Sequence, residues 1–200
     1  MTGPSVHPTA LIAADTRSAD VLTVGAFAVV GVDGDGAPVT LGAGAVLRSH
    51  TVLYRGVRAG NGLMTGHGTL IREGTVVGDD VSVGSHTVLE HHVTVGDRVR
   101  IHSSAFIPEL TKLEDDVWIG PGVRITNARY PNRADTEANL RGVTIARGAF
   151  VGAGAALLPG VRIGAGATVG AGAVVVRDVT DGTAAVGNPA ALTVDRRDDR

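Results

Sequence analysis

Residues 81–120 read VSVGSHTVLEHHVTVGDRVRIHSSAFIPELTKLEDDVWIG, and every sixth residue from Val83 to Ile119 is aliphatic. The same count extends outward, so that thirteen of the fifteen such positions between Leu41 and Ile125 are Leu, Ile or Val. It resumes at Ile145 and runs to Val175. A short fixed period marks a solenoid, and a period of six is typical of a β-helix. The repeat therefore predicts an all-β fold of short strands and tight turns.

A second regularity lies four residues after each aliphatic position, where the chain places a small or β-branched residue such as Thr87 or Val93. Alternation along a strand puts both side chains of a repeat on one face, so both are expected to point inward. Glycine often follows the aliphatic residue directly, and we expect it to relieve a tight corner by adopting a positive φ. These glycines are Gly42, Gly60, Gly66, Gly78, Gly84, Gly96, Gly120, Gly152, Gly164 and Gly170.

Composition narrows the functional classes. The chain has 200 residues, 3% aromatic residues and a net charge of −2, with Lys and Arg spread along it. A nucleic-acid or membrane surface partner is not indicated. There is no cysteine, which excludes disulfides and a thiolate nucleophile. No apolar run is long enough to span a membrane, and a soluble cytoplasmic protein is expected.

The repeat is interrupted twice. An eleven-residue step between Val30 and Leu41 predicts a small protruding loop, with about one coil before it. A twenty-residue step between Ile125 and Ile145 predicts a longer polar insert, and such loops often bind ligands, although a tolerated surface insertion is the alternative. We expect one β-helix domain: an N-terminal segment (1–11), coils (12–125), the inserted loop (126–142), last coils (143–180) and a cap and tail (181–200).

The repeat resembles the hexapeptide-repeat, left-handed parallel β-helix acyltransferases, in which three repeats make one triangular coil. The resemblance implies about eight coils and a homotrimer with sites between subunits. It also places residues eighteen apart above one another, in one column at a corner. One column contains a histidine between two carboxylates and ends at the insert; a solvated ladder of surface charges is the alternative. Its members are Arg55, Glu73, His91, Glu109 and Asn127.

The C-terminal part, from Ile163 to Ala190, resembles the end of acetyl-CoA-dependent transferases of this type, including the run Gly187-Asn188-Pro189-Ala190. Acetyl-CoA is therefore the expected co-substrate, and no metal is expected. Those transferases usually have a basic residue directly after this run, but this chain has Ala191 at that position. The coenzyme phosphates therefore need another partner, such as Arg177. The residues that the resemblance assigns to the coenzyme are Gly152, Ala153, Gly170, Ala171, Arg177 and Asn188.

The middle of the chain is similar to sugar N-acetyltransferases that modify nucleotide-linked 3-amino sugars. The similarity rests on the segment from Ile101 to Glu109 and on the run from Ile119 to Tyr130-Pro131, which leads into the insert. It implies that an amine attacks acetyl-CoA directly. The residues expected to act in catalysis are His91, Glu109 and Asn127, and those expected to bind the sugar are Glu73, Arg72, Tyr130 and His102.

Other functions are compatible with the same residues. An O-acetyltransferase uses the same fold and coenzyme. A zinc protein similar to the γ-class carbonic anhydrases would use His50, His86 and His91, although that family's other polar residues are missing; the adjacent His91 and His92 are expected to point apart. A structural trimer without catalysis is the remaining alternative.

Overall fold

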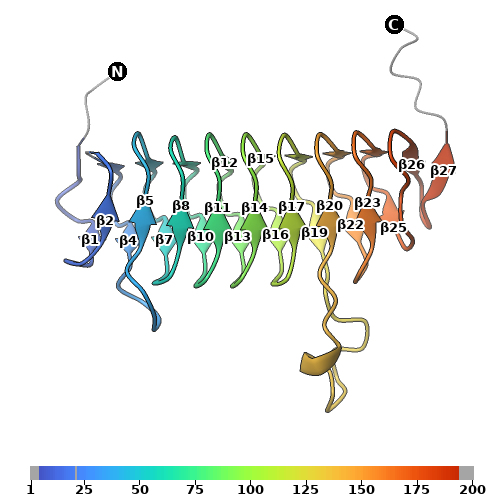
Figure 1. Cartoon of the computed structure of the whole chain (residues 1–200), viewed down its shortest axis with the longest axis horizontal. Coiled ribbons are helices and arrows are strands. Elements are labelled where there is room, and N and C mark those ends of the chain that lie inside the picture. Colours follow the sequence, from blue (N-terminus) through green and yellow to red (C-terminus); the bar gives the residue numbers. More distant parts are fainter. Residues whose placement is uncertain (1–4, 21, 194–200) are drawn as a thin grey trace, which may run out of the picture.

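The computed structural model describes residues 5–20 and 22–193, which form a parallel β-helix (Figure 1). The outer ends of the predicted N-terminal segment and C-terminal tail, 1–4 and 194–200, lie outside the described residues. The described part has no α-helix, and its only helical turn is the 3-10 helix η1 (Glu137–Asn139). No helix in the described residues is long and apolar enough to cross a membrane.

Three sheets form the walls of the prism, and the chain visits them in the order 1, 2, 3. Sheet 1 contains β1 (Leu11–Ile12), β4 (Val29–Val30), β7 (Val52–Leu53), β10 (Leu70–Ile71), β13 (Val88–Leu89), β16 (Phe106–Ile107), β19 (Arg124–Ile125), β22 (Ala156–Leu157) and β25 (Val174–Val175). Sheet 2 contains β2 (Arg17–Ser18), β5 (Thr40–Leu41), β8 (Arg58–Ala59), β11 (Val76–Val77), β14 (Thr94–Val95), β17 (Lys112–Leu113), β20 (Thr144–Ile145) and β23 (Arg162–Ile163). Sheet 3 contains β3 (Thr23–Val24), β6 (Val46–Leu47), β9 (Met64–Thr65), β12 (Ser82–Val83), β15 (Arg100–Ile101), β18 (Trp118–Ile119), β21 (Phe150–Val151), β24 (Thr168–Val169), β26 (Ala184–Val186) and β27 (Ala191–Thr193).

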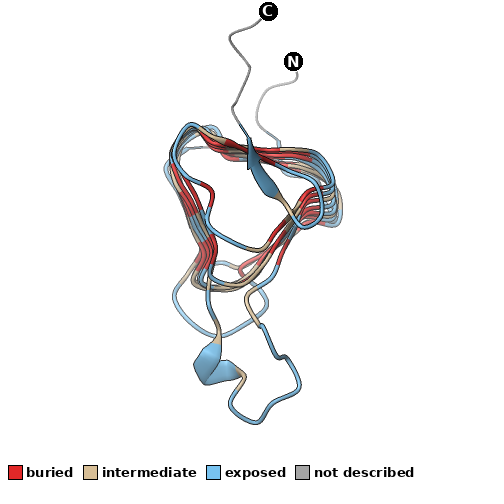
Figure 2. Cartoon of the chain, turned by 90° about the vertical axis from the view of Figure 1, so that its right-hand side faces the viewer, coloured by how far each residue is buried: buried red, intermediate tan, exposed pale blue. Residues whose placement is uncertain are grey.

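The coils stack in register with a repeat of eighteen residues. Val88 pairs with Leu70 on one side and with Phe106 on the other, in parallel strands. Viewed along its axis, the helix has a triangular outline with the buried positions turned inward (Figure 2). The second residue of each strand supplies the core: Leu89, for example, is fully buried. The predicted architecture is therefore confirmed.

The number of coils exceeds the predicted eight, because the three sheets hold nine, eight and ten strands. Strands β1 to β3 lie ahead of the regular count, where the pattern is weaker. At the other end, β26 adds a rung to sheet 3 and β27 pairs with it in antiparallel fashion.

The glycine that follows the inward residue plays a different part from the one predicted. Gly60, Gly84 and Gly120 are not among the residues with positive φ, which instead lie two positions later in the turn, at Gly62 and Gly122 for instance. The reason for glycine is close approach of the next coil. A Cβ on Gly120 would lie 2.6 Å from the backbone nitrogen of Ala153, a distance that sterics forbid.

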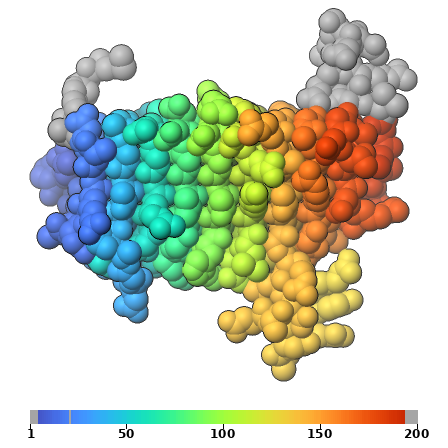
Figure 3. All heavy atoms as spheres, viewed as in Figure 1, coloured from blue at the N-terminus to red at the C-terminus, as the bar shows by residue number. Residues whose placement is uncertain are grey.

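Both interruptions leave the helix at the corner where sheet 1 passes into sheet 2, here called corner 1/2. The first loop connects β4 to β5 and the insert connects β19 to β20. Both project from the same side of the helix (Figures 1 and 2), and the insert stands clear of the body in the space-filling view (Figure 3). The corner between sheets 3 and 1 is called corner 3/1.

The outward faces of the sheets differ in polarity. The outward residue of a strand is its first residue, and on sheet 2 these residues are mostly polar or charged. On sheet 1 they are apolar except for Arg124 and form a stripe along the helix. The apolar stripe of sheet 1 consists of Leu11, Val29, Val52, Leu70, Val88, Phe106, Ala156 and Val174.

Candidate active site

Corner 1/2 carries the predicted column. Each member stands two residues after a strand of sheet 1, so successive coils place the side chains one rung apart, about 4.8 Å. Glu73, His91 and Glu109 follow β10, β13 and β16 and are half-buried. Asn127 follows β19, at the point where the insert begins. The strands thus place the Glu73 carboxylate, the His91 imidazole, the Glu109 carboxylate and the Asn127 amide in one column.

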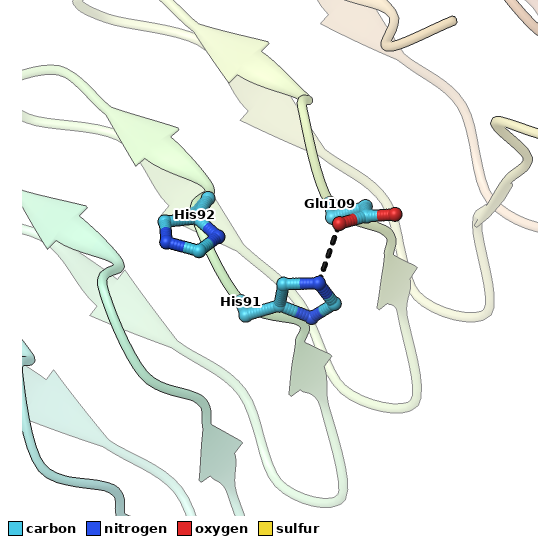
Figure 4. A group of neighbouring side chains, drawn as sticks. All are labelled: His91, His92 and Glu109. Carbon is cyan, nitrogen blue, oxygen red and sulfur yellow. Dashed lines mark ion pairs between the residues drawn. The ribbon is translucent and has the colours of Figure 1, made fainter. Parts of the chain in front are cut away.

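His91 and Glu109 form the central contact of the column (Figure 4). The Nε2 atom of His91 lies 2.5 Å from Oε2 of Glu109. An ionised carboxylate only accepts, so Nε2–H donates and Nδ1 keeps its lone pair. Nδ1 is buried and has no hydrogen-bond partner among the described residues, since Oε2 of Glu90 is 3.6 Å away. A buried ring nitrogen without a partner calls for an explanation, and a role in proton transfer would supply one.

Arg72 forms ion pairs with Glu73 and Glu90 beside His91, and these three residues are here called the clamp. Arg72 donates from Nη2 to Oε1 of Glu73 at 2.8 Å and from Nη1 to Oε2 of Glu90 at 2.7 Å. The hydrogen bond with Glu73 raises the pKa of Arg72, against the effect of burial. Burial favours the neutral form of Glu73, but hydrogen bonds from its own backbone and from Arg72 outweigh it, so its pKa is lowered. The clamp keeps Glu73 and Arg72 ionised beside His91.

The two ends of the column have separate contacts. Arg55 forms a two-pronged ion pair with Asp15 and donates to the carbonyl of Gly36, so it fastens the first loop to the coils. At the other end, Nδ2 of Asn127 donates to the Glu109 carbonyl at 3.4 Å. Tyr130 lies further out in the insert, 57% exposed. Asn127 is thus the member that joins the column to the insert.

Other predicted residues lie at corner 3/1. His102 follows β15 and packs on Trp118, with ring centroids 4.5 Å apart. Four of the residues predicted to bind the coenzyme follow strands of sheet 3. Gly152 and Ala153 come after β21, and Gly170 and Ala171 come after β24. His50 and His86 share this corner, whereas His91 does not, so a zinc site built from these three residues would need a neighbouring subunit.

Of the remaining coenzyme candidates, Arg177 is separated from that group, whereas Asn188 follows a strand of the same sheet 3. Arg177 follows β25 of sheet 1 and therefore lies at corner 1/2, where it lines a cavity of about 230 Å³. Asn188 follows β26 and is exposed. Within a single chain, the residues predicted to bind one coenzyme are thus distributed over two corners.

His92 adds a third donor beside the pair. Ligand atoms of His91, His92 and Glu109 all lie within 4.8 Å of one another, and the two imidazole rings meet edge to face at 5.3 Å. The two imidazole rings thus lie close together, where they were expected to point apart, and the Cδ2–Nε2 edge of the exposed His92 ring packs over Gly74 of the preceding coil. The donor set of two imidazoles and one carboxylate suits Zn²⁺.

Two features of this corner were missed from the sequence. Glu90 is the second carboxylate beside His91, and its spacing of eighteen from Arg72 was a signal for their ion pair. The insert also encloses a cavity of about 370 Å³. Its three arginines were visible in the sequence, but nothing in their spacing predicts a cavity.

Comparison with known families identifies the repeat. The family model "Bacterial transferase hexapeptide (six repeats)" matches residues 74–109 and 142–177. The search of curated proteins finds no match.

Solved structures share the fold at low identity. LpxA, a UDP-N-acetylglucosamine acyltransferase from Bacteroides fragilis, superposes with a TM-score of 0.70 at 12% identity, over 94% of this chain and 74% of its own. The polySia-specific acetyltransferase NeuO gives 0.55 at 17% identity, over 93% and 82%.

The acetyltransferase domain of PglB from Neisseria gonorrhoeae, solved with acetyl coenzyme A, gives 0.47 at 22% identity over 72% of this chain. The match spans only 57% of that domain. The matched repeats and the stacked coils together show a hexapeptide-repeat β-helix, in which residues 74–109 and 142–177 are similar to the repeats of bacterial transferases.

Proposed function

We propose that the protein is an acetyl-CoA-dependent N-acetyltransferase acting on an amino sugar, linked to a nucleotide. The observation that carries the proposal is the His91–Glu109 pair with its unpartnered Nδ1, set in a polar column beside the insert. The hexapeptide-transferase repeat supports acyl transfer. Among the structures with the same fold, LpxA acts on a nucleotide sugar and NeuO is an acetyltransferase, which agrees with the proposed chemistry.

The reaction needs no nucleophile on the protein. The amine nitrogen attacks the thioester carbonyl carbon, a C–N bond forms, and the C–S bond breaks as coenzyme A leaves. Nδ1 of His91 takes the proton that the nitrogen loses, and that proton replaces the acetyl group on sulfur. Glu109 holds the ring in the required tautomer and stabilises the positive charge that develops on it.

Stabilisation of the oxyanion requires a free backbone N–H group, and the N–H groups of Gly152 and Gly170 are already hydrogen-bonded. The N–H of Gly152 donates to the Val169 carbonyl at 2.7 Å, and that of Gly170 to the Ala185 carbonyl at 2.9 Å. The next residues, Ala153 and Ala171, are exposed, and their N–H groups have no partner in the described part of the chain. We assign the oxyanion and the coenzyme arm to these N–H groups.

A homotrimer would bring these groups to His91. Sheet 1 carries the apolar stripe, and its two edges are corner 1/2 and corner 3/1. Around a three-fold axis that faces the stripe, corner 1/2 of one copy meets corner 3/1 of the next. Such an arrangement buries the stripe. It also unites His91 of one copy with Ala153 and Ala171 of its neighbour, which one chain alone cannot do.

The test is thiol release from acetyl-CoA with amino sugars, hydroxy sugars and their nucleotide-linked forms. We expect His91→Ala to lower kcat/KM by about 10²–10⁴-fold, the usual contribution of a general base. Glu109→Gln keeps a hydrogen-bonding group but removes the charge, and it should lower kcat more than KM. Glu114→Gln, a carboxylate away from corner 1/2, is the control.

Near-wild-type turnover of both His91→Ala and Glu109→Gln would rule out this column as the active site. Preference for a hydroxy sugar over its amino counterpart would instead establish an O-acetyltransferase, for which the same imidazole would activate the hydroxyl.

A further inference from the structure

The insert encloses a cavity of about 370 Å³ against the coil that follows it. Eight of its nine lining residues come from the insert itself, and Pro159 supplies the wall on the coil. The insert projects from the body in Figures 1 and 3, so this cavity is reached from solvent. Its lining is Ala128, Arg129, Tyr130, Arg133, Asp135, Thr136, Asn139, Arg141 and Pro159.

The lining is strongly cationic. It holds three guanidinium groups and one carboxylate, and that carboxylate, Asp135, accepts from Nδ2 of Asn139 at 3.0 Å. Arg133 lies over the ring of Tyr130, 4.5 Å from its centroid, and Arg141 donates to the Leu140 carbonyl. Within residues 5–20 and 22–193, Arg129 and Arg133 form no ion pair with any carboxylate. The guanidinium groups of Arg129 and Arg133 are therefore available to bind an anion.

Hydrogen bonds tie the backbone of the insert together, so the loop that carries the arginines is ordered before a ligand arrives. The hydroxyl of Thr136 lies 2.8 Å from the Tyr130 carbonyl oxygen and 2.7 Å from that of Arg133, so its single hydrogen bonds one of them, and its oxygen accepts from the Arg133 N–H. At the base, the Arg141 N–H donates to the Asn127 carbonyl and the Gly160 N–H to the Arg141 carbonyl. Ordering in advance lowers the entropic cost of binding.

The cavity also lies at a suitable distance from the reacting pair. Its first lining residue, Ala128, follows Asn127, which is two coils from His91, or about 10 Å along the column. A sugar ring with its amine at His91 spans part of this distance, and its anomeric diphosphate extends the substrate toward the insert that carries the arginines. Guanidinium groups recognise phosphate oxygens through paired hydrogen bonds.

We propose that Arg129 and Arg133 bind the diphosphate of the nucleotide-linked amino sugar in this cavity. The assignment rests on the proposed function for the identity of the sugar substrate, whereas the anion site itself follows from the cavity. Coenzyme A also carries a diphosphate, but the long pantetheine arm would have to fold back to place it so near His91.

The experiment is calorimetric titration of the full-length protein with UDP, GDP, dTDP and coenzyme A, each in separate runs. We compare wild type with Arg129→Ala, Arg133→Ala and the double variant, and with Arg58→Ala as the control, an exposed arginine on sheet 2. We expect at least one nucleoside diphosphate to bind wild type and to bind each single variant about tenfold more weakly, as loss of a charged hydrogen bond implies. The control and the affinity for coenzyme A should not change.

Equal affinity in wild type and double variant would overturn the proposal, as would absence of nucleoside diphosphate binding or an effect confined to coenzyme A. Circular dichroism checks that the variants are folded. Acetyl transfer is measured in parallel, where the variants should raise KM for the nucleotide-linked sugar and leave turnover of the free amino sugar unchanged. Diphosphate binding that depends on Arg129 and Arg133 in a protein that acetylates no sugar would retain the anion site and reject the proposed function.

Discussion

At the scale of single residues, His91 can serve a proton or a metal ion, and the two uses compete for the same ring. The proton on Nε2 of His91 lies between that atom and Oε2 of Glu109, which are 2.5 Å apart. A metal ion bound between these two atoms would displace the proton. His92 stands close enough to complete a set of three ligands. A three-ligand site leaves a fourth position open on Zn²⁺. Zinc bound here would block the proton transfer assigned to His91.

We therefore expect added Zn²⁺ to inhibit acetyl transfer, while protein treated with EDTA keeps its full activity. His92→Ala removes a ligand and leaves the His91–Glu109 pair intact, so it should raise the half-inhibitory zinc concentration by about tenfold or more. Initial rates over a zinc series, with Mg²⁺ as a control, measure this. Loss of activity on EDTA treatment would show instead that the reaction depends on a metal.

Much of this site can be predicted from the six-residue repeat together with the family resemblance, which places residues eighteen apart one rung apart. The contacts of His91 with Glu109 and of Arg72 with Glu90 both follow that rule. Contacts within one turn do not. The approach of His92 to Glu109 depends on the positive φ of 55° at His92, which a period of six residues does not encode. The glycines were misjudged for the same reason, since close approach is a property of the neighbouring coil.

At the scale of structural elements, corner 1/2 combines its reactive groups with ion pairs that stabilise the coils. The lowered pKa of Glu73 means that its carboxylate is more favourable in the folded than in the unfolded chain. A depressed folded-state pKa gives stability that is fully present above the unfolded value. That stability is lost as the pH falls through the folded value.

We expect the melting temperature to decrease below a pH of about 4.5, the ordinary value for glutamate, in part because Glu73 takes up a proton. Glu73→Gln should lower the melting temperature at neutral pH, and its deficit relative to wild type should shrink as the pH falls. Calorimetric scans between neutral and acidic pH compare the two proteins. A deficit that stays constant over this range would show that the charge of Glu73 does not stabilise the fold.

The insert illustrates the limit of prediction for an element. Its position follows from the twenty-residue step, because the aliphatic count in sixes fails after Ile125 and resumes at Ile145 in a new phase. Its interior does not follow, because the cavity depends on how Thr136 and Asn139 tie the loop to itself. Nothing periodic governs those contacts.

At the scale of the whole molecule, the unequal faces of the prism point to its assembly. The apolar stripe of sheet 1 includes Val88 and the exposed ring of Phe106, whereas sheet 2 carries Arg58 and Lys112 at the corresponding positions. The strands could be predicted from the repeat, but the stripe emerges only when outward residues are grouped by sheet.

We expect Val88→Asp, on the stripe, to dissociate the proposed trimer, because a carboxylate in an apolar interface is costly. Val76→Asp makes the same change at a half-buried outward position on sheet 2 and is the matched control. Sedimentation velocity at micromolar concentration should show a trimer for wild type and control and a smaller species for Val88→Asp. Acetyl transfer should fall together with the trimer. A wild-type monomer would contradict the assembly, and a trimeric Val88→Asp variant would place the interface elsewhere.

Both loops interrupt the coil at the same corner, and after each interruption the eighteen-residue stacking resumes without a shift, as when β17 pairs with β20 across the insert. The framework therefore imposes no length and no composition on what leaves it there. A lineage of such proteins can exchange the insert, and with it the ligand that is recognised, while the imidazole and its carboxylate stay in place. Under the proposed function, the insert would set which ligand is recognised and the His91–Glu109 pair would set the chemistry, so that a change in one would leave the other in place.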